Sequence, residues 1–144
     1  MLSSEELMVL HRQWMWANVM RESFYAHLGE GGNAKPAEEF FPDRVGGFMC
    51  VWYGMLFSVL EVVKEKSLAI EGIEDLDTIY EPLRLFRNAV FHAQPKYWSP
   101  KLFEIMKDPE SALKIRKIHS ALGKFFLTEL RNRREKQHEE GKTT

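Results

Sequence analysis

Cysteine is almost missing from this chain: Cys50 is the only one among 144 residues, and it lies in an apolar run. One cysteine cannot form a disulfide within the chain or a zinc site built from cysteines. Cys50 is therefore interpreted as a small buried hydrophobic residue. Nor do His11, His27, His119 and His138 have the spacing of a metal-binding set, so they are interpreted as structural or surface residues. We expect no metal and no cofactor.

Net charge is also nearly absent, because 20 Lys and Arg oppose 21 Asp and Glu, which leaves −1. Such a chain has no general basic field for nucleic acid, so any RNA binding must use a local patch. The first residues include Glu5 and Glu6 rather than the basic start of a signal peptide. No uncharged apolar stretch is long enough to span a bilayer. We therefore predict a cytoplasmic protein with no membrane segment.

A third absence is alternation of period two, the mark of half-buried strands. What is present instead is a globular composition, with 44% hydrophobic and 12% aromatic residues, and apolar residues at helical spacing. The chain length fits one domain. We predict a single all-α domain over residues 1–144, an up-down bundle of four main helices with antiparallel neighbours and short extra helices.

The first half of the chain predicts two long helices. Ser3 or Ser4 can cap a helix that ends at Gly29. A loop rich in glycine and proline follows over residues 29–42. Asp43 can cap a second helix to about Lys66, which is the most apolar and should be central. The apolar stripe of the first helix consists of Leu7, Leu10, Trp14, Ala17, Phe24 and Leu28. Three glycines cost helix propensity in the second helix, and close packing of a neighbour is the expected reason: Gly46, Gly47 and Gly54.

The second half predicts a third helix from Glu81 to about Ala93, with Pro82 in its first turn. A short helical turn is expected just before it, over residues 73–80. Gln94-Pro95 should end the third helix.

Two further helix starts are marked by a cap residue followed by proline. Ser99-Pro100 predicts a short helix to about Lys107, and Asp108-Pro109 predicts the start of a long final helix through Leu130. Its end, 131–136, is polar all round. We expect residues 135–144 to be a frayed tail.

The third helix has one apolar face and one unusual face. Its expected core positions are Ile79, Leu83, Phe86, Val90 and Ala93. On the opposite side fall Arg84, Arg87, Asn88, Phe91 and His92. An exposed phenylalanine among guanidinium, amide and imidazole groups indicates a surface for a ligand or a second subunit.

The residue chemistry of this face suits a phosphodiester. An imidazole can move a proton near neutral pH, and a guanidinium can hold phosphate oxygens and the charge that develops on them. Asn88 and His92 are four residues apart and share a face, whereas Arg87 and His92 are separated by about 140° on an ideal helix. Arg87 must therefore reach around, or the last turn must loosen before Pro95. By spacing alone, a solvated helix surface explains these residues more often than a site does.

The hexapeptide Arg87-Asn88-Ala89-Val90-Phe91-His92 resembles the signature of the HEPN superfamily. That signature is an arginine, four to six residues and a histidine, usually with Asn, Asp or His after the arginine. The apolar segment 52–61 resembles the aromatic-rich helix that precedes the motif in several HEPN subfamilies. The resemblance covers most of the chain in outline and six residues in detail.

The resemblance implies a bundle of four to five helices that forms a homodimer, with two motif helices facing each other and sharing one site. Active members are metal-independent endoribonucleases in which the ribose 2′-OH attacks the adjacent phosphate. Carried over, Arg87 would stabilise the phosphorane, His92 would act as acid or base or orient the phosphate, and Asn88 would position one of them. Many members are toxins or defence effectors, which allows an antitoxin protein as a partner.

Other residues are candidates for the same site, each with a plainer alternative. Tyr97 and Trp98 could stack unpaired bases, or they could pin a loop to the core. Glu61 could pair with Arg84 or Arg87 and set its geometry, or it could be solvated. Arg84 is expected at the substrate or the dimer contact. The basic segment 131–136 could touch phosphates but fits a solvated helix end better.

Three functions remain open. We expect an RNA-cleaving homodimer with Arg87, Asn88 and His92 as the catalytic residues. The alternative is an inactive HEPN-type module that binds a nucleotide, RNA or a protein. A weaker possibility is a structural adaptor whose motif face is only a subunit contact.

Overall fold

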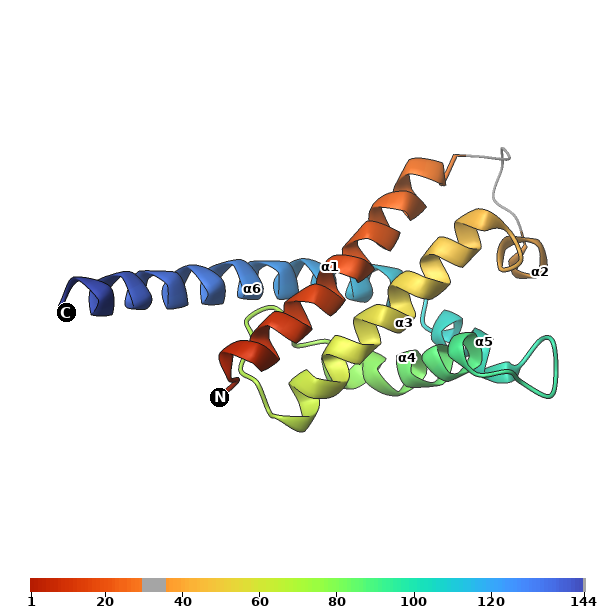
Figure 1. Cartoon of the computed structure of the whole chain (residues 1–144). Coiled ribbons are helices and arrows are strands. Elements are labelled where there is room, and N and C mark those ends of the chain that lie inside the picture. Colours follow the sequence, from red (N-terminus) through yellow and green to blue (C-terminus); the bar gives the residue numbers. More distant parts are fainter. Residues whose placement is uncertain (30–35, 144) are drawn as a thin grey trace.

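The all-α prediction is confirmed by the computed structural model, which describes residues 1–29 and 36–143 (Figure 1). Helices account for the regular structure of these residues, and no strand occurs among them. The elements are α1 (Ser4–His27), α2 (Ala37–Phe40), α3 (Arg44–Glu65), α4 (Leu76–Phe91), α5 (Pro100–Phe103), the 3-10 helix η1 (Glu104–Lys107) and α6 (Ser111–Lys142).

The start of α1 is defined by side-chain capping. The Ser3 hydroxyl accepts from the Glu6 N–H, and the Glu6 carboxylate accepts from the Ser3 N–H. These reciprocal bonds satisfy two donors that a helix start leaves open. Most of the predicted stripe faces the core, but Leu28 is exposed, because α1 ends at His27 one residue before it.

The central helix of the bundle is α3, as predicted. Asp43 caps it through a bond to the Arg44 N–H, and α1 and α4 pack on it. By length and composition, α3 is the one described helix that could cross a membrane, and 61% of its apolar window is buried inside the protein. That burial is what the core helix of a soluble bundle shows. A cytoplasmic location remains a prediction.

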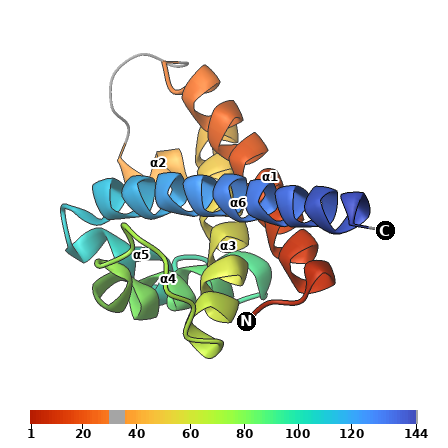
Figure 2. The same cartoon turned by 90° about the vertical axis from the view of Figure 1, so that its left-hand side faces the viewer.

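The arrangement of the long helices differs from a set of parallel rods. α1 and α3 run side by side in opposite directions, whereas α6 lies across them (Figure 2). The C-terminal part of α6 projects past the other helices in both views. The structure continues α6 as helix to Lys142, through most of the segment 135–144 that was predicted to fray. Residue 144 lies outside the described residues.

Two boundaries in the middle of the chain also differ from prediction. The predicted loop 29–42 contains α2 at its end, while residues 30–35 lie outside the described residues. The separate turn before Glu81 is wrong, because α4 runs unbroken from Leu76 with Pro82 inside it. Burial of Leu76 and Ile79 stabilises this first part of α4 despite the N–H that Pro82 lacks.

The last helices begin close to their predicted starts. Ser99 caps α5 through the Lys101 N–H, and η1 continues α5 to Lys107, as predicted. α6 starts at Ser111 rather than directly after Pro109, because the Asp108 carboxylate accepts the Glu110 N–H and holds a turn there.

A polar cluster ties α1, α3 and α6 together inside the core. The Trp52 indole donates to His119 Nδ1 at 3.1 Å, so His119 Nε2 carries the proton and donates to Asn18 Oδ1 at 3.0 Å. The Trp14 indole donates to the His119 carbonyl at 3.0 Å. Burial, with a smaller contribution from Arg21, lowers the pKa of His119 to about 4. His119 is thus a structural histidine, in agreement with the sequence interpretation.

Candidate functional site

The motif residues lie where α4 ends, next to α5 (Figure 1). The last helical bond runs from the His92 N–H to the Asn88 carbonyl, and the His92 backbone is extended. The side chain of Gln94 donates to the carbonyls of Asn88 at 3.1 Å and His92 at 2.9 Å. Gln94 therefore adds a second hydrogen bond to the Asn88 carbonyl and satisfies the His92 carbonyl just after the helix. α4 ends at Phe91 rather than Ala93, and Ala93 is exposed instead of buried.

This early end frees the histidine of the motif from the helical geometry that would separate it from the arginine. Because His92 has left the helix, its side chain is not bound to the helical position about 140° from Arg87. The loosening of the last turn is thus one of the two solutions that the sequence predicted. His92 is exposed, and its ring makes no hydrogen bond with a described residue.

Arg87 is the most constrained side chain of the motif. Its guanidinium lies over the buried ring of Phe57, 4.7 Å from the centroid. Arg87 Nε donates to Asn88 Oδ1 at 2.9 Å, and Nη1 lies 3.4 Å from Glu61 Oε2. Among the described residues, Nη2 has no hydrogen-bond partner. The guanidinium is therefore oriented by three groups and keeps donors for an anion.

Two of these contacts decide between options that the sequence left open. Glu61 pairs with Arg87 and not with Arg84. Asn88 contacts Arg87 and makes no hydrogen bond with the His92 ring. Asn88 therefore orients the arginine.

Arg84 and Phe91 differ from the exposed pair that the sequence predicted. Arg84 turns to its own helix, where Nε binds Glu81 Oε2 at 2.9 Å. Phe91 is 48% exposed, but its ring lies so close to α3 that a Cβ on Gly54 would be 2.2 Å from it. Phe91 is thus partly covered within its own chain, and half of it remains available to another surface.

Tyr97 and Trp98, the aromatic pair after the motif, differ in their surroundings: one ring packs on the bundle and the other is exposed. Trp98 is half-buried, and its ring lies 5.9 Å from that of Phe103 in α5, so it holds the loop to the bundle. Tyr97 is 76% exposed and contacts Trp98 edge-on at 4.6 Å. Of these two rings, only that of Tyr97 is exposed enough for a base to reach.

Lys64 and Tyr80 extend this face and were missed from the sequence. The Lys64 ammonium lies 4.0 Å from the centre of the Tyr80 ring, which in turn lies 5.0 Å from that of Phe57. Burial, then the charge of Glu61, raises the pKa of Tyr80. The available signal was the spacing of Phe57, Glu61 and Lys64 at i, i+4 and i+7, which places them on one face of α3.

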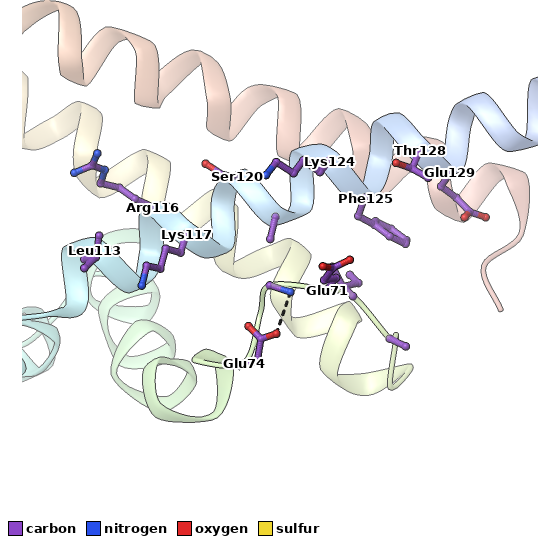
Figure 3. A pocket seen from close by; sticks show the side chains of 14 residues that line it. Glu71, Glu74, Leu113, Arg116, Lys117, Ser120, Lys124, Phe125, Thr128 and Glu129 are labelled. Atoms are coloured by element: carbon purple, nitrogen blue, oxygen red, sulfur yellow. Dashed lines mark hydrogen bonds between the residues drawn. The ribbon is translucent and has the colours of Figure 1, made fainter.

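The motif lies on open surface, and the described residues contain no group of three or more His, Cys, Asp or Glu that could hold a metal. A groove of about 710 Å³ lies elsewhere, between segment 69–74 and α6 (Figure 3). Comparisons with protein-family models, curated proteins and solved structures gave no match for this chain.

Proposed function

We propose that this protein is a metal-independent endoribonuclease of the HEPN type, with Arg87, Asn88 and His92 as its catalytic and positioning residues. One observation carries the proposal: a guanidinium oriented by Phe57, Glu61 and Asn88 at a helix end that also presents an exposed imidazole. An arginine without a function could simply be solvated. Arg87 is instead oriented by three groups, and it keeps N–H donors that a ligand can use.

The proposed reaction needs few groups. The 2′-oxygen of a ribose bonds to the adjacent phosphorus, and the bond from phosphorus to the 5′-oxygen breaks. The proton of the 2′-OH passes to an imidazole, and the departing 5′-oxygen takes a proton from another acid. The products are a 2′,3′-cyclic phosphate and a 5′-hydroxyl, and Arg87 stabilises the charge on the phosphorane oxygens.

A dimer would supply the second acid–base group. His92 within one chain can serve as base, and His92 of the partner subunit can serve as acid if the two α4 ends meet. The exposed half of Phe91, adjacent to His92, is the apolar surface available for that contact. Arg87 supplies positive charge at the phosphate, so the mechanism uses no metal.

The test is cleavage of mixed-sequence single-stranded RNA by purified protein, with the product ends examined. We expect cyclic phosphate ends, and the same rate in EDTA as in magnesium. Loss of cleavage in EDTA with recovery in magnesium would rule out this mechanism.

The second candidate is an inactive module that binds RNA, a nucleotide or a protein at the same face. The open surface around His92 and the exposed ring of Tyr97 favour it, because neither requires chemistry. It becomes the better explanation if folded, dimeric protein cuts none of a varied set of RNAs. The biological settings of a toxin or defence effector, with an antitoxin partner, belong to the first candidate.

A further inference from the structure

Three cations line the groove between segment 69–74 and α6. Arg116, Lys117 and Lys124 line it, and none of the three forms an ion pair with a described residue. Elsewhere in the described chain some cations are paired, as in Lys66 with Glu6 and Lys114 with Asp108. All three side chains are exposed, so an anionic ligand can reach them.

Three carboxylates also line the groove and offset part of this charge: Glu71, Glu74 and Glu129. Glu129 is engaged by Arg133 at 3.1 Å, and Glu74 accepts the Gly72 N–H at 3.3 Å. Only Glu71 is left without such a partner among the lining carboxylates. With Glu129 paired to Arg133, three cations face the two carboxylates Glu71 and Glu74, so the groove has a net charge of +1.

The spacing of the two lysines on α6 places their positive charges in a line along one face of the helix. Lys117 and Lys124 are one heptad apart, so they lie on one face with their Cα atoms about 10 Å apart along the helix. Lys117 and Phe125 point from α6 toward segment 69–74, and Glu71 lies beneath the Phe125 ring (Figure 3). Arg116 points away from that segment and stands at the rim.

The walls of the groove are held close together. Gly72 has a backbone φ of +91°, which residues with a side chain rarely adopt. A Cβ at this position would lie 3.0 Å from Ala121 Cβ on α6. This approach positions segment 69–74 against the helix. Ammonium groups in a row, a half-buried aromatic ring and a hydrogen-bond acceptor match the phosphates, a base and a ribose or amino group of RNA.

We propose that this groove binds the flanking part of a single-stranded RNA substrate, with phosphates on Lys117 and Lys124 and one base against Phe125. The proposal rests on the proposed function for its choice of ligand. The groove lies beside the start of α4 and the motif at its end, so a strand that follows α4 for its 16 residues would span about 24 Å. The groove would then set how the substrate enters the site.

The test measures binding rather than cleavage. Fluorescence anisotropy of a labelled single-stranded RNA is recorded with His92→Ala protein, which leaves the RNA uncut, over a range of salt. Adding K117Q/K124Q should weaken binding about tenfold or more and reduce the salt slope by roughly 1.4, since each single-strand phosphate contact contributes about 0.7. Phe125→Leu keeps apolar packing and should weaken binding about fivefold or more through lost stacking.

The matched control is K136Q/K142Q, which removes the same charge from the same helix beyond the groove. RNA binding should change little in the control. An equal loss of RNA affinity in both double variants would overturn the groove proposal, because it would show that the lysines act only through the general charge of the protein. Unchanged RNA binding by K117Q/K124Q would also overturn it. So would adenosine monophosphate binding that needs these lysines while RNA binding does not.

The two proposals fail separately. If the wild-type protein cuts RNA and K117Q/K124Q binds RNA as the wild type does, the groove proposal falls and the nuclease stands. If the wild-type protein cuts nothing but K117Q/K124Q weakens RNA binding, the groove stands and the nuclease falls.

Discussion

Arg87 shows how a surface residue of α4 becomes a precise chemical group. One face of its guanidinium lies over the Phe57 ring, and two of its N–H groups donate to Asn88 and Glu61. The Glu61 contact is solvent-exposed on the acidic side, so it adds little stability and serves mainly to orient. Lysine could not reproduce this arrangement, because an ammonium lacks the planar fork.

At the residue scale, His92→Ala should lower the RNA cleavage rate by about two to four orders of magnitude, the usual range for lost acid–base catalysis. Arg87→Ala should be comparably severe, and Arg87→Lys should recover only part of the rate. Stability should barely change in His92→Ala, because the side chain is exposed and leaves no cavity. Rates come from single-turnover cleavage, and stability from urea unfolding.

Asn88→Ala should lower the RNA cleavage rate less than His92→Ala or Arg87→Ala does, since it removes only one of the three groups that orient Arg87. A His92→Ala protein that cuts as fast as wild type would exclude His92 from the chemistry. A protein that unfolds on this change would show that the exposed position of His92 is wrong.

At the element scale, two adjacent glycines at the start of α3 make a matched pair. A Cβ on Gly46 would lie 2.0 Å from the Phe40 carbonyl oxygen, so Gly46→Ala must push the α2 backbone away and should cost about 1–3 kcal/mol. Gly47 has nothing within 4 Å, so Gly47→Ala should stabilise by about 0.5 kcal/mol through helix propensity. Urea unfolding of both variants measures the difference.

Opposite signs for the two variants are the expected result. Equal effects would mean that α2 does not pack against α3 as described. The sequence interpretation of close packing thus holds at Gly46 and Gly54 but not at Gly47, which meets open space.

The junction of α1, α3 and α6 should be sensitive to acid through His119. The unfolded histidine takes a proton below about pH 6.5, whereas the folded pKa is about 4, because burial disfavours the charged ring. Between these values the unfolded state binds more protons, so stability falls as the pH is lowered. The full loss is about 3 kcal/mol, reached near pH 4.

His119→Gln isolates this contribution, because glutamine does not titrate. Urea unfolding between pH 7 and 4.5 should show a steeper loss for wild type than for His119→Gln. The pKa of Glu6, lowered to about 2 by its hydrogen bonds with Lys66 and Ser3, places the acid loss of that pair mostly below this window. Parallel pH profiles for the two proteins would contradict a buried neutral His119.

At the scale of the whole molecule, two surfaces are candidates for the contact of the proposed dimer. Phe91 on α4 is the one that the composite site requires. α1 carries a longer apolar stripe, in which each side chain is 41–54% exposed: Met8, Val9, Met15, Trp16 and Val19. A dimer formed through α1 alone would leave the two motifs apart, since this stripe faces away from α3 and α4.

Phe91→Glu and Trp16→Glu compare these surfaces directly, because both side chains are 48% exposed. We expect light scattering to show a monomer for Phe91→Glu, with loss of RNA cleavage, and a dimer with normal cleavage for Trp16→Glu. A charge buried at the true contact is costly, whereas one on a free surface is not. The opposite pattern would move the dimer contact to α1 and remove the shared site.

The sequence by itself determined the elements and the motif. Serine and aspartate caps located the starts of α1 and α3 within a residue, since capping depends on bonds within one turn. Apolar spacing identified most of the core for the same local reason. The pattern from Arg87 to His92 could be found because it is written in six consecutive residues.

Only the tertiary structure decided what surrounds these residues. Three features depend on how α3 packs against α4. α4 begins six residues before Pro82, the Phe57 ring lies against Arg87, and Glu61 pairs with Arg87 rather than with Arg84. The crossing of α6 likewise creates a groove from segments some 45 residues apart in the chain. Such contacts join residues distant in sequence, and helical periodicity states which face is apolar but not which neighbour covers it.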